Sequence, residues 1–169
     1  MKMPALFLPL LLLAGCGFHP LMGQSDVGTA TAELERIRVS SIADRSGQML
    51  RNQLMQDLAP RGDAVASRYT LQVKLQEPRQ EIALSRDESA SRISYAANAT
   101  FTLTDSATGR ALFGGVASST STFEATNSEF ASISAQLGAR DRAVQEISAD
   151  IRQQLAAYFG RTARGIPSR

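Results

Sequence analysis

The sequence predicts one α+β domain in which two helices pack on one face of a four-stranded, mostly antiparallel sheet, in the order β-α-β-β-β-α. Strand-like alternation of apolar and polar residues fills the middle of the chain, and apolar residues at helical spacing flank it on both sides. A length of 169 residues suits a single domain with a core of ordinary size. The 18 basic and 16 acidic residues nearly balance, which argues against a nucleic-acid partner.

Residues 1–15 have the pattern of a lipoprotein signal peptide. Lys2 supplies a positive charge, and the apolar run over residues 5–13 is far shorter than the roughly 20 residues of a membrane-spanning helix. The four residues that end at Cys16, Leu-Ala-Gly-Cys, resemble the bacterial lipobox. We therefore expect cleavage before Cys16, and a diacylglycerol and an N-acyl group on this residue that anchor the protein without spanning the bilayer. Gly17 in place of Asp points to the outer membrane under the sorting rule of such proteins.

Residues 16–32 are rich in Gly, Ser, Thr and Ala without periodicity, which predicts a lipidated tether. The domain is then expected over residues 33–160, and alternation over residues 35–39 predicts its first strand. A helix follows, with Asp44 or Ser46 as the expected N-cap. Its apolar stripe comprises Leu50, Leu54 and Leu58.

Three segments predict an antiparallel meander. Residues 69–76 alternate as a half-buried strand, and residues 82–84 are a candidate continuation of it. A longer alternation over residues 93–103 ends at a hairpin turn, residues 105–109. A Gly/Ser/Thr-rich strand follows, in which the adjacent Gly114 and Gly115 indicate a bulge or close packing. The face of the sheet away from the helices should be neutral and polar, carrying Thr100, Thr102, Thr104, Ser118, Thr120 and Thr122.

A long helix is predicted over residues 127–159, either continuous or broken at Gly138, since glycine costs about 1 kcal/mol in a helix interior. Gly160 is expected directly after the helix, at the C′ position, and residues 161–169 form a tail that we expect to be disordered. Arg140 is the one polar residue within its apolar stripe. The stripe comprises Phe130, Ile133, Leu137, Val144, Ile147, Ile151, Leu155 and Tyr158.

No residue pattern indicates catalysis. The chain has one His and one Cys, which leaves neither a metal site nor a Ser-His-Asp triad. His19 lies in the predicted tether, and Asp87 and Glu88 lie in a predicted turn. Neither a nucleophile elbow nor a phosphate-binding glycine loop is present. We therefore expect no enzymatic activity, no metal and no cofactor.

Two features are candidates for binding. Arg79, Arg86 and Arg92 surround the second predicted hairpin, where they either bind phosphate groups or are ordinary solvated charges. The polar sheet face suits contact with the polar interior of a porin-like barrel, and it is equally compatible with an ordinary solvated face.

The start of the mature chain, Cys-Gly-Phe-His-Pro-Leu from Cys16, resembles that of the LptE family, lipoproteins of outer-membrane lipopolysaccharide assembly. Weaker similarity continues through residues 41–54, 69–73, 105–109 and 139–155, and the expected order of elements is similar to the family's fold. The resemblance implies a 1:1 plug inside an LptD-type outer-membrane β-barrel, which assists barrel assembly and helps insert lipopolysaccharide into the outer leaflet. It further implies a lipid-anchored position on the periplasmic side of the outer membrane and in the barrel lumen.

By position, Arg86 corresponds best to a basic residue of the family that contacts lipopolysaccharide, and Arg92 is a second candidate. Arg140 is a weaker counterpart of another basic residue, near the start of the last helix. A different interpretation remains open: a periplasmic lipoprotein that serves a lipid-transport ABC system, or a secretin pilot protein. An apolar lipid-binding groove would favour the transport accessory.

Overall fold

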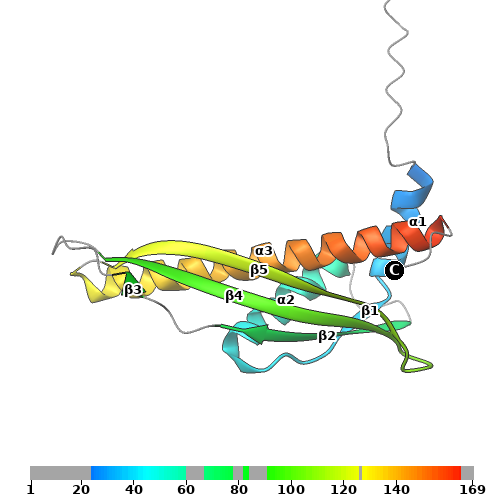
Figure 1. Cartoon of the computed structure of the whole chain (residues 1–169), viewed down its shortest axis with the longest axis horizontal. Helices are drawn as coiled ribbons and strands as arrows, with labels where there is room; N and C mark the ends of the chain where they lie inside the picture. Colours follow the sequence, from blue (N-terminus) through cyan, green and yellow to red (C-terminus); the bar gives the residue numbers. More distant parts are fainter. Residues whose placement is uncertain (1–23, 60–66, 78–81, 84–90, 126, 165–169) are drawn as a thin grey trace, which may run out of the picture.

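The computed structural model describes residues 24–59, 67–77, 82–83, 91–125 and 127–164. The elements are α1 (Gln24–Leu34), β1 (Ile37–Val39), α2 (Asp44–Leu58), β2 (Tyr69–Gln76), β3 (Ile82–Ala83), β4 (Ser91–Asp105), β5 (Ala111–Ala125) and α3 (Glu129–Ala163). Figure 1 shows an elongated molecule in which a long sheet and the long helix α3 run side by side. The predicted α+β class is confirmed.

The sheet is mixed and four strands wide. β1 pairs with β2 in parallel, whereas β2, β3 and β5 all pair with β4 in antiparallel fashion. β5 pairs with β4 along almost its whole length, so β2 and β3 must share the opposite edge of β4. Residues 82 and 83 therefore lie in line with β2, as the predicted continuation required, and the meander β2–β4–β5 is confirmed.

One face of the sheet is buried by helices. Alternate residues of β4 point to this face, and α2 and α3 cover them with apolar stripes. The buried residues of β4 are Tyr95, Ala97, Ala99, Phe101 and Leu103. Those of the helix stripes include Leu50, Leu54, Leu58, Ile147, Ile151 and Leu155. Among the described residues no helix covers the opposite face, which we call the open face.

The helix α1 corrects the predicted tether over residues 16–32. Residues 24–34 are helical, and Ala30 and Leu34 are buried against α3. Packing explains the helix, because Gly28 and its neighbouring threonines are poor helix formers on their own. Glu33 adds a link to the sheet, since the Tyr69 hydroxyl donates to its carboxylate (2.8 Å). Residues 1–15, Cys16 and the tether up to residue 23 lie outside the described residues.

The predicted cap of α2 is wrong, although the helix itself is confirmed. Ala43 occupies the N-cap position, without a side-chain hydrogen bond, and Asp44 has φ +66°. Neither Asp44 nor Ser46 caps the helix, because the chain turns tightly around the buried Ile42. A Cβ atom on Gly47 would lie 2.7 Å from the Ile42 side chain, so this turn requires glycine.

The helix α3 is continuous over 35 residues, about 50 Å. Gly138 does not break it, because Ala139 and Ala143 are fully buried beside it and their packing offsets the cost of glycine. Gly160 is inside the helix rather than at its end, and its carbonyl accepts from Arg164 Nε (3.0 Å). The predicted disordered tail is therefore wrong for residues 161–163, and residues 165–169 lie outside the described part.

The predicted hairpin turn after β4 is confirmed. Asp105 Oδ1 accepts hydrogen bonds from the backbone N–H groups of Ala107 (3.0 Å) and Thr108 (2.9 Å). The Thr108 hydroxyl donates to the same oxygen (3.0 Å), and these bonds to Thr108 and Ala107 lower the pKa of Asp105. Gly109 closes the turn with φ +69°, which a residue without a Cβ adopts at little cost.

Candidate interaction surface

The open face is a continuous polar surface across β2, β4 and β5. Strand register places its side chains in rows, in which Gln76, Asn98 and Ser118 form one row and Lys74, Thr100 and Val116 the next. The other members are Thr70, Gln72, Ser94, Ala96, Thr102, Thr104, Gly114, Thr120 and Thr122. Antiparallel strands rise about 3.4 Å per residue, so the 15 residues of β4 make this face roughly 50 Å long.

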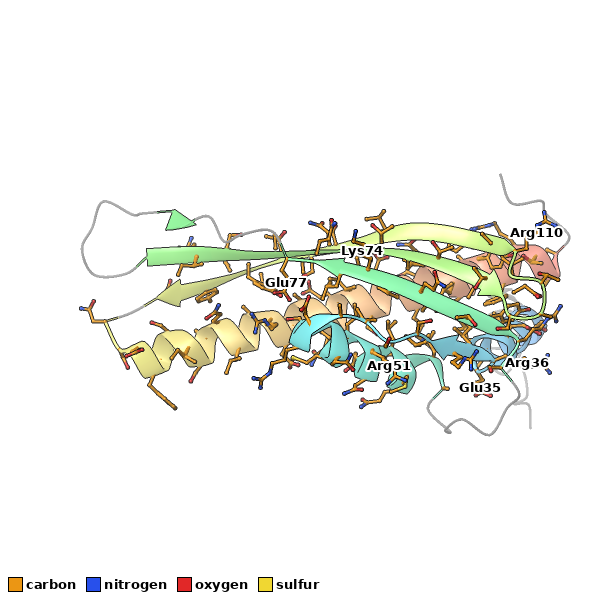
Figure 2. The ribbon with its side chains drawn as sticks, turned by 90° about the horizontal axis from the view of Figure 1, so that it is seen from below. Glu35, Arg36, Arg51, Lys74, Glu77 and Arg110 are labelled. Atoms are coloured by element: carbon orange, nitrogen blue, oxygen red, sulfur yellow. The ribbon has the colours of Figure 1, made fainter. Side chains whose placement is uncertain are left out.

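Hydroxyl and amide groups dominate the open face, and charges are few. Two threonines are linked at its β2 side, where the Thr104 hydroxyl donates to the Thr70 carbonyl oxygen (3.1 Å). Figure 2 shows Lys74 on β2, near the middle of the sheet. The predicted neutral, polar face is therefore present. Chemically it can exchange hydrogen bonds with another polar surface.

Arg92 lies at the end of the sheet where β4 begins. Its guanidinium faces the Glu124 carboxylate across the strand pair at 3.7 Å. The two side chains are 73% and 64% exposed, so water screens the pair and it contributes little stability. Arg92 can therefore exchange Glu124 for another anion. Arg86, Arg79 and the lipid-acceptor candidate Cys16 lie outside the described residues, so the structure does not place them relative to Arg92.

A second cluster, which sequence analysis did not find, lies under the sheet between β2, β4 and α3. Arg140 stacks over the Tyr95 ring (5.8 Å to its centre) and faces the Glu77 carboxylate at 3.8 Å. Burial and the nearby Glu77 carboxylate both raise the pKa of Tyr95. Arg140 lowers it, but the net effect is a raised pKa. Among the described residues, the Tyr95 hydroxyl and Arg140 Nε are buried without hydrogen-bond partners. In the sequence, the one indication of this cluster is that Arg140 occupies a polar position within an apolar helical stripe.

The first part of α3 exposes apolar side chains that the helical spacing predicted to be buried. Phe130 is 82% exposed, Ile133 49% and Leu137 50%. The cause is a difference in length, because α2 has 15 residues and α3 has 35, so α2 covers less than half of α3. These three residues follow the same helical stripe as Val144 and Ile151, which are buried.

Two hollows between the described elements are lined by charges of both signs. One, of about 290 Å³, lies between β1 and α2 and is lined by Glu35, Arg38 and Arg51. Figure 2 shows Glu35 and Arg51 in this part of the molecule. Another, of about 680 Å³, is an open groove between the end of β5 and the first part of α3. Neither is an enclosed apolar cavity.

Within the described residues, no group of three or more His, Cys, Asp and Glu side chains is arranged to hold a metal ion. Two of the buried serine hydroxyls make structural hydrogen bonds: Ser148 donates to Asp57 and Ser119 to Glu146, each at 2.6 Å. None of the described helices is both long and apolar enough to cross a membrane.

The sequence matches no protein-family model and no curated protein. Solved structures resemble the chain. A candidate lipoprotein from Caulobacter crescentus has a TM-score of 0.64 and 23% identity, covering 79% of this chain and 97% of its own. A minor lipoprotein from Acinetobacter baumannii has a TM-score of 0.54 and 14% identity, covering 72% and 91%. At these identities the likeness establishes a shared fold.

Proposed function

We propose that this chain is an outer-membrane lipoprotein of the lipopolysaccharide-assembly machinery, lipidated at Cys16 and seated in the lumen of an LptD-type barrel. The observation that carries the proposal is the open face, a long, nearly uncharged surface of hydroxyl and amide groups. The lipoprotein part is supported by the lipobox at Cys16 and by the two lipoproteins that share the fold.

The open face suits a barrel lumen for a physical reason. The interior of an outer-membrane barrel is polar and wet, so a partner there needs hydrogen-bonding groups and no large apolar patch. Hydroxyl side chains meet this need at low entropic cost, because they have few rotatable bonds. The proposed role is structural and requires neither a catalytic residue nor a cofactor.

Substitution on the open face tests the barrel contact. Asn98→Glu adds a charge to a central row, and we expect it to lower recovery of a barrel-sized partner about tenfold, because a carboxylate buried at the contact would lose its water. Gln153→Glu makes the same change of charge on the exposed side of α3 and serves as the matched control. Equal recovery with both variants would remove the open face from the contact.

We further propose that Arg86 and Arg92 bind the phosphate groups of lipopolysaccharide through charge-assisted hydrogen bonds. Arg92 supports this role because its present partner, Glu124, is exposed and readily displaced. Charge reversal, Arg86→Glu or Arg92→Glu, should weaken lipopolysaccharide binding by the purified chain about tenfold without unfolding it.

Arg110 offers a matched control, since it is exposed and lies in Figure 2 at the α1 end of the molecule, away from β3. Arg110→Glu should leave lipopolysaccharide binding unchanged. Full binding by Arg86→Glu would exclude the hairpin from the site, and equal loss with Arg110→Glu would indicate attraction by net charge alone.

A further inference from the structure

The free edge of β5 lacks the features that usually protect an edge strand. β5 is 15 residues long, and β4 is its only partner strand among the described elements. From Ala111 to Phe123 it contains no charged residue and no proline. Natural proteins commonly place such residues on exposed edges, because unpaired N–H and C=O groups recruit further strands.

Strand alternation identifies the groups at this edge. The Asp105 N–H donates to the Arg110 carbonyl, on the β5 side of β4 (3.0 Å). Alternate residues of a strand face opposite neighbours, so the other odd-numbered residues of β4 also bond to β5. The register shifts by one residue between Leu103 and Thr104, and on the β3 side of this shift the odd-numbered residues of β4 pair with odd-numbered residues of β5, from Phe113 to Ala125. Even-numbered residues of β5 therefore turn their N–H and C=O groups outward. Gln154 fits this pattern, since its amide donates to the outward Val116 carbonyl oxygen (2.9 Å).

The groove of about 680 Å³ runs beside the last part of this edge. Thr122 and Phe123 form one wall, and Ser134, Ala135 and Gly138 of α3 form the other. At the left of Figure 2, where β5 ends and α3 begins, α3 lies beyond β5 on the side away from β4, so the helix flanks this part of the free edge. An edge strand with a parallel wall of small side chains is the arrangement that binds extended peptides by strand addition.

The charged residues that line the groove indicate which kind of peptide segment it would bind. Arg142 lies at the groove and is exposed, and it has no ion-pair partner among the described residues. The other two charges there, Arg92 and Glu124, pair with each other. The groove thus has a surplus positive charge, which favours an acidic side chain in the bound segment.

A second copy of the chain fits this edge poorly. Two β5 strands related by a twofold axis would place both α3 helices on the same side of the joined sheet, each flanking the shared edge. A single extended segment brings no second helix to this edge, so it avoids this crowding. We propose that the β5 edge from Ser118 to Glu124 and the α3 wall together bind an extended, acidic segment of another protein by strand addition. This inference does not depend on the proposed barrel partner.

The test uses p-benzoylphenylalanine as a photo-crosslinker at Thr122 of the edge strand or at Ser134, an exposed residue of the α3 wall that is not part of the open face, in the full lipidated chain, irradiated in cells. We expect a crosslink to one extended segment of one other protein from both positions. Thr120→Pro removes an outward N–H, whereas the matched Thr120→Ala removes only the side chain. The proline variant should lower the crosslink yield about tenfold and the alanine variant should not.

Arg142→Glu gives a second test, since this side chain is exposed and its change should leave the fold intact. It should lower the yield about tenfold, and Arg142→Lys should retain most of it. Equal yields for the proline and alanine variants, a crosslink to a second copy, or a crosslink to lipid alone would each overturn the proposal. A crosslinker at Gln72, on the open face of β2, reports the barrel contact separately, so the two proposals can fail independently.

Discussion

Two adjacent glycines of β5 should respond in opposite ways to alanine. A Cβ atom on Gly115, which faces the helices, would lie 2.6 Å and 2.9 Å from two ring carbons of Phe101 and 2.5 Å from Gln154 Oε1. A Cβ atom on Gly114, which faces the open side, would meet only the Phe101 carbonyl oxygen, at an ordinary 3.4 Å. The pair therefore compares a crowded and an open position in one strand.

The magnitudes follow from these contacts. Phe101 is 1% exposed and packs against Phe113, so its ring cannot move aside freely. Gln154 can move, but it then loses its hydrogen bond to Val116, which is worth about 1 kcal/mol. Crowding in a packed core costs about 1–3 kcal/mol, against a gain of about 0.4–1 kcal/mol from restricting the unfolded chain. Gly115→Ala should therefore lower the free energy of unfolding by about 1–3 kcal/mol.

Gly114→Ala should leave that free energy unchanged or raise it by up to about 1 kcal/mol, because only the unfolded-chain effect remains. Urea unfolding of the purified chain in mild detergent, followed by circular dichroism, measures both variants against the original. The slope of the free energy of unfolding against urea concentration should be the same for all three chains, because neither substitution changes the surface exposed on unfolding. Similar stabilities for the two variants would refute the assigned faces of β5.

Two further predictions concern buried hydroxyls. Burial and the hydrogen bond to Glu33 raise the pKa of Tyr69 to about 12, against 10 when unfolded. The stability that the neutral Tyr69 hydroxyl contributes is therefore fully present below pH 10 and is lost as the pH rises through 12. Urea unfolding at a series of pH values should show the free energy of unfolding falling by up to about 2–3 kcal/mol over that range. Tyr69→Phe should remove the Tyr69 part of this slope and leave only that of Tyr95, whose pKa is also raised by burial; a slope equal to that of the original chain would place its origin elsewhere. Ser148→Ala should lower the free energy of unfolding in urea by about 1–2 kcal/mol, because Asp57 loses the hydrogen bond (2.6 Å) that the fully buried Ser148 hydroxyl donates. A loss below about 0.3 kcal/mol would show that water replaces the hydroxyl.

Strand patterns could be read from the sequence because one face of the sheet is buried and the other is not. The alternation over residues 69–76 matches β2 residue for residue, and the two faces of β4 follow from the same rule. The polar surface was predictable for that reason. The periodicity does not identify the partner of this surface, so the proposed barrel contact combines the polarity of the open face with the family resemblance.

Features that depend on tertiary packing could not be predicted from the sequence pattern. The helix α1 forms around Ala30 and Leu34, which gain burial only when α3 is present. The exposure of Phe130, Ile133 and Leu137 depends on where α2 ends relative to α3, which helical spacing within α3 cannot reveal. The direction of the free β5 edge likewise requires the strand order.

The proposed barrel contact is tested most directly by identifying the proteins that co-purify with the chain from the membrane. The tagged, lipidated chain would be isolated from outer-membrane extract in mild detergent and separated by gel electrophoresis with and without boiling. We predict a stoichiometric partner of barrel size whose mobility changes on heating, and about tenfold lower recovery of this partner with Asn98→Glu. Recovery of the chain alone, or together with an inner-membrane transport ATPase, would contradict the barrel role and favour the transport-accessory interpretation.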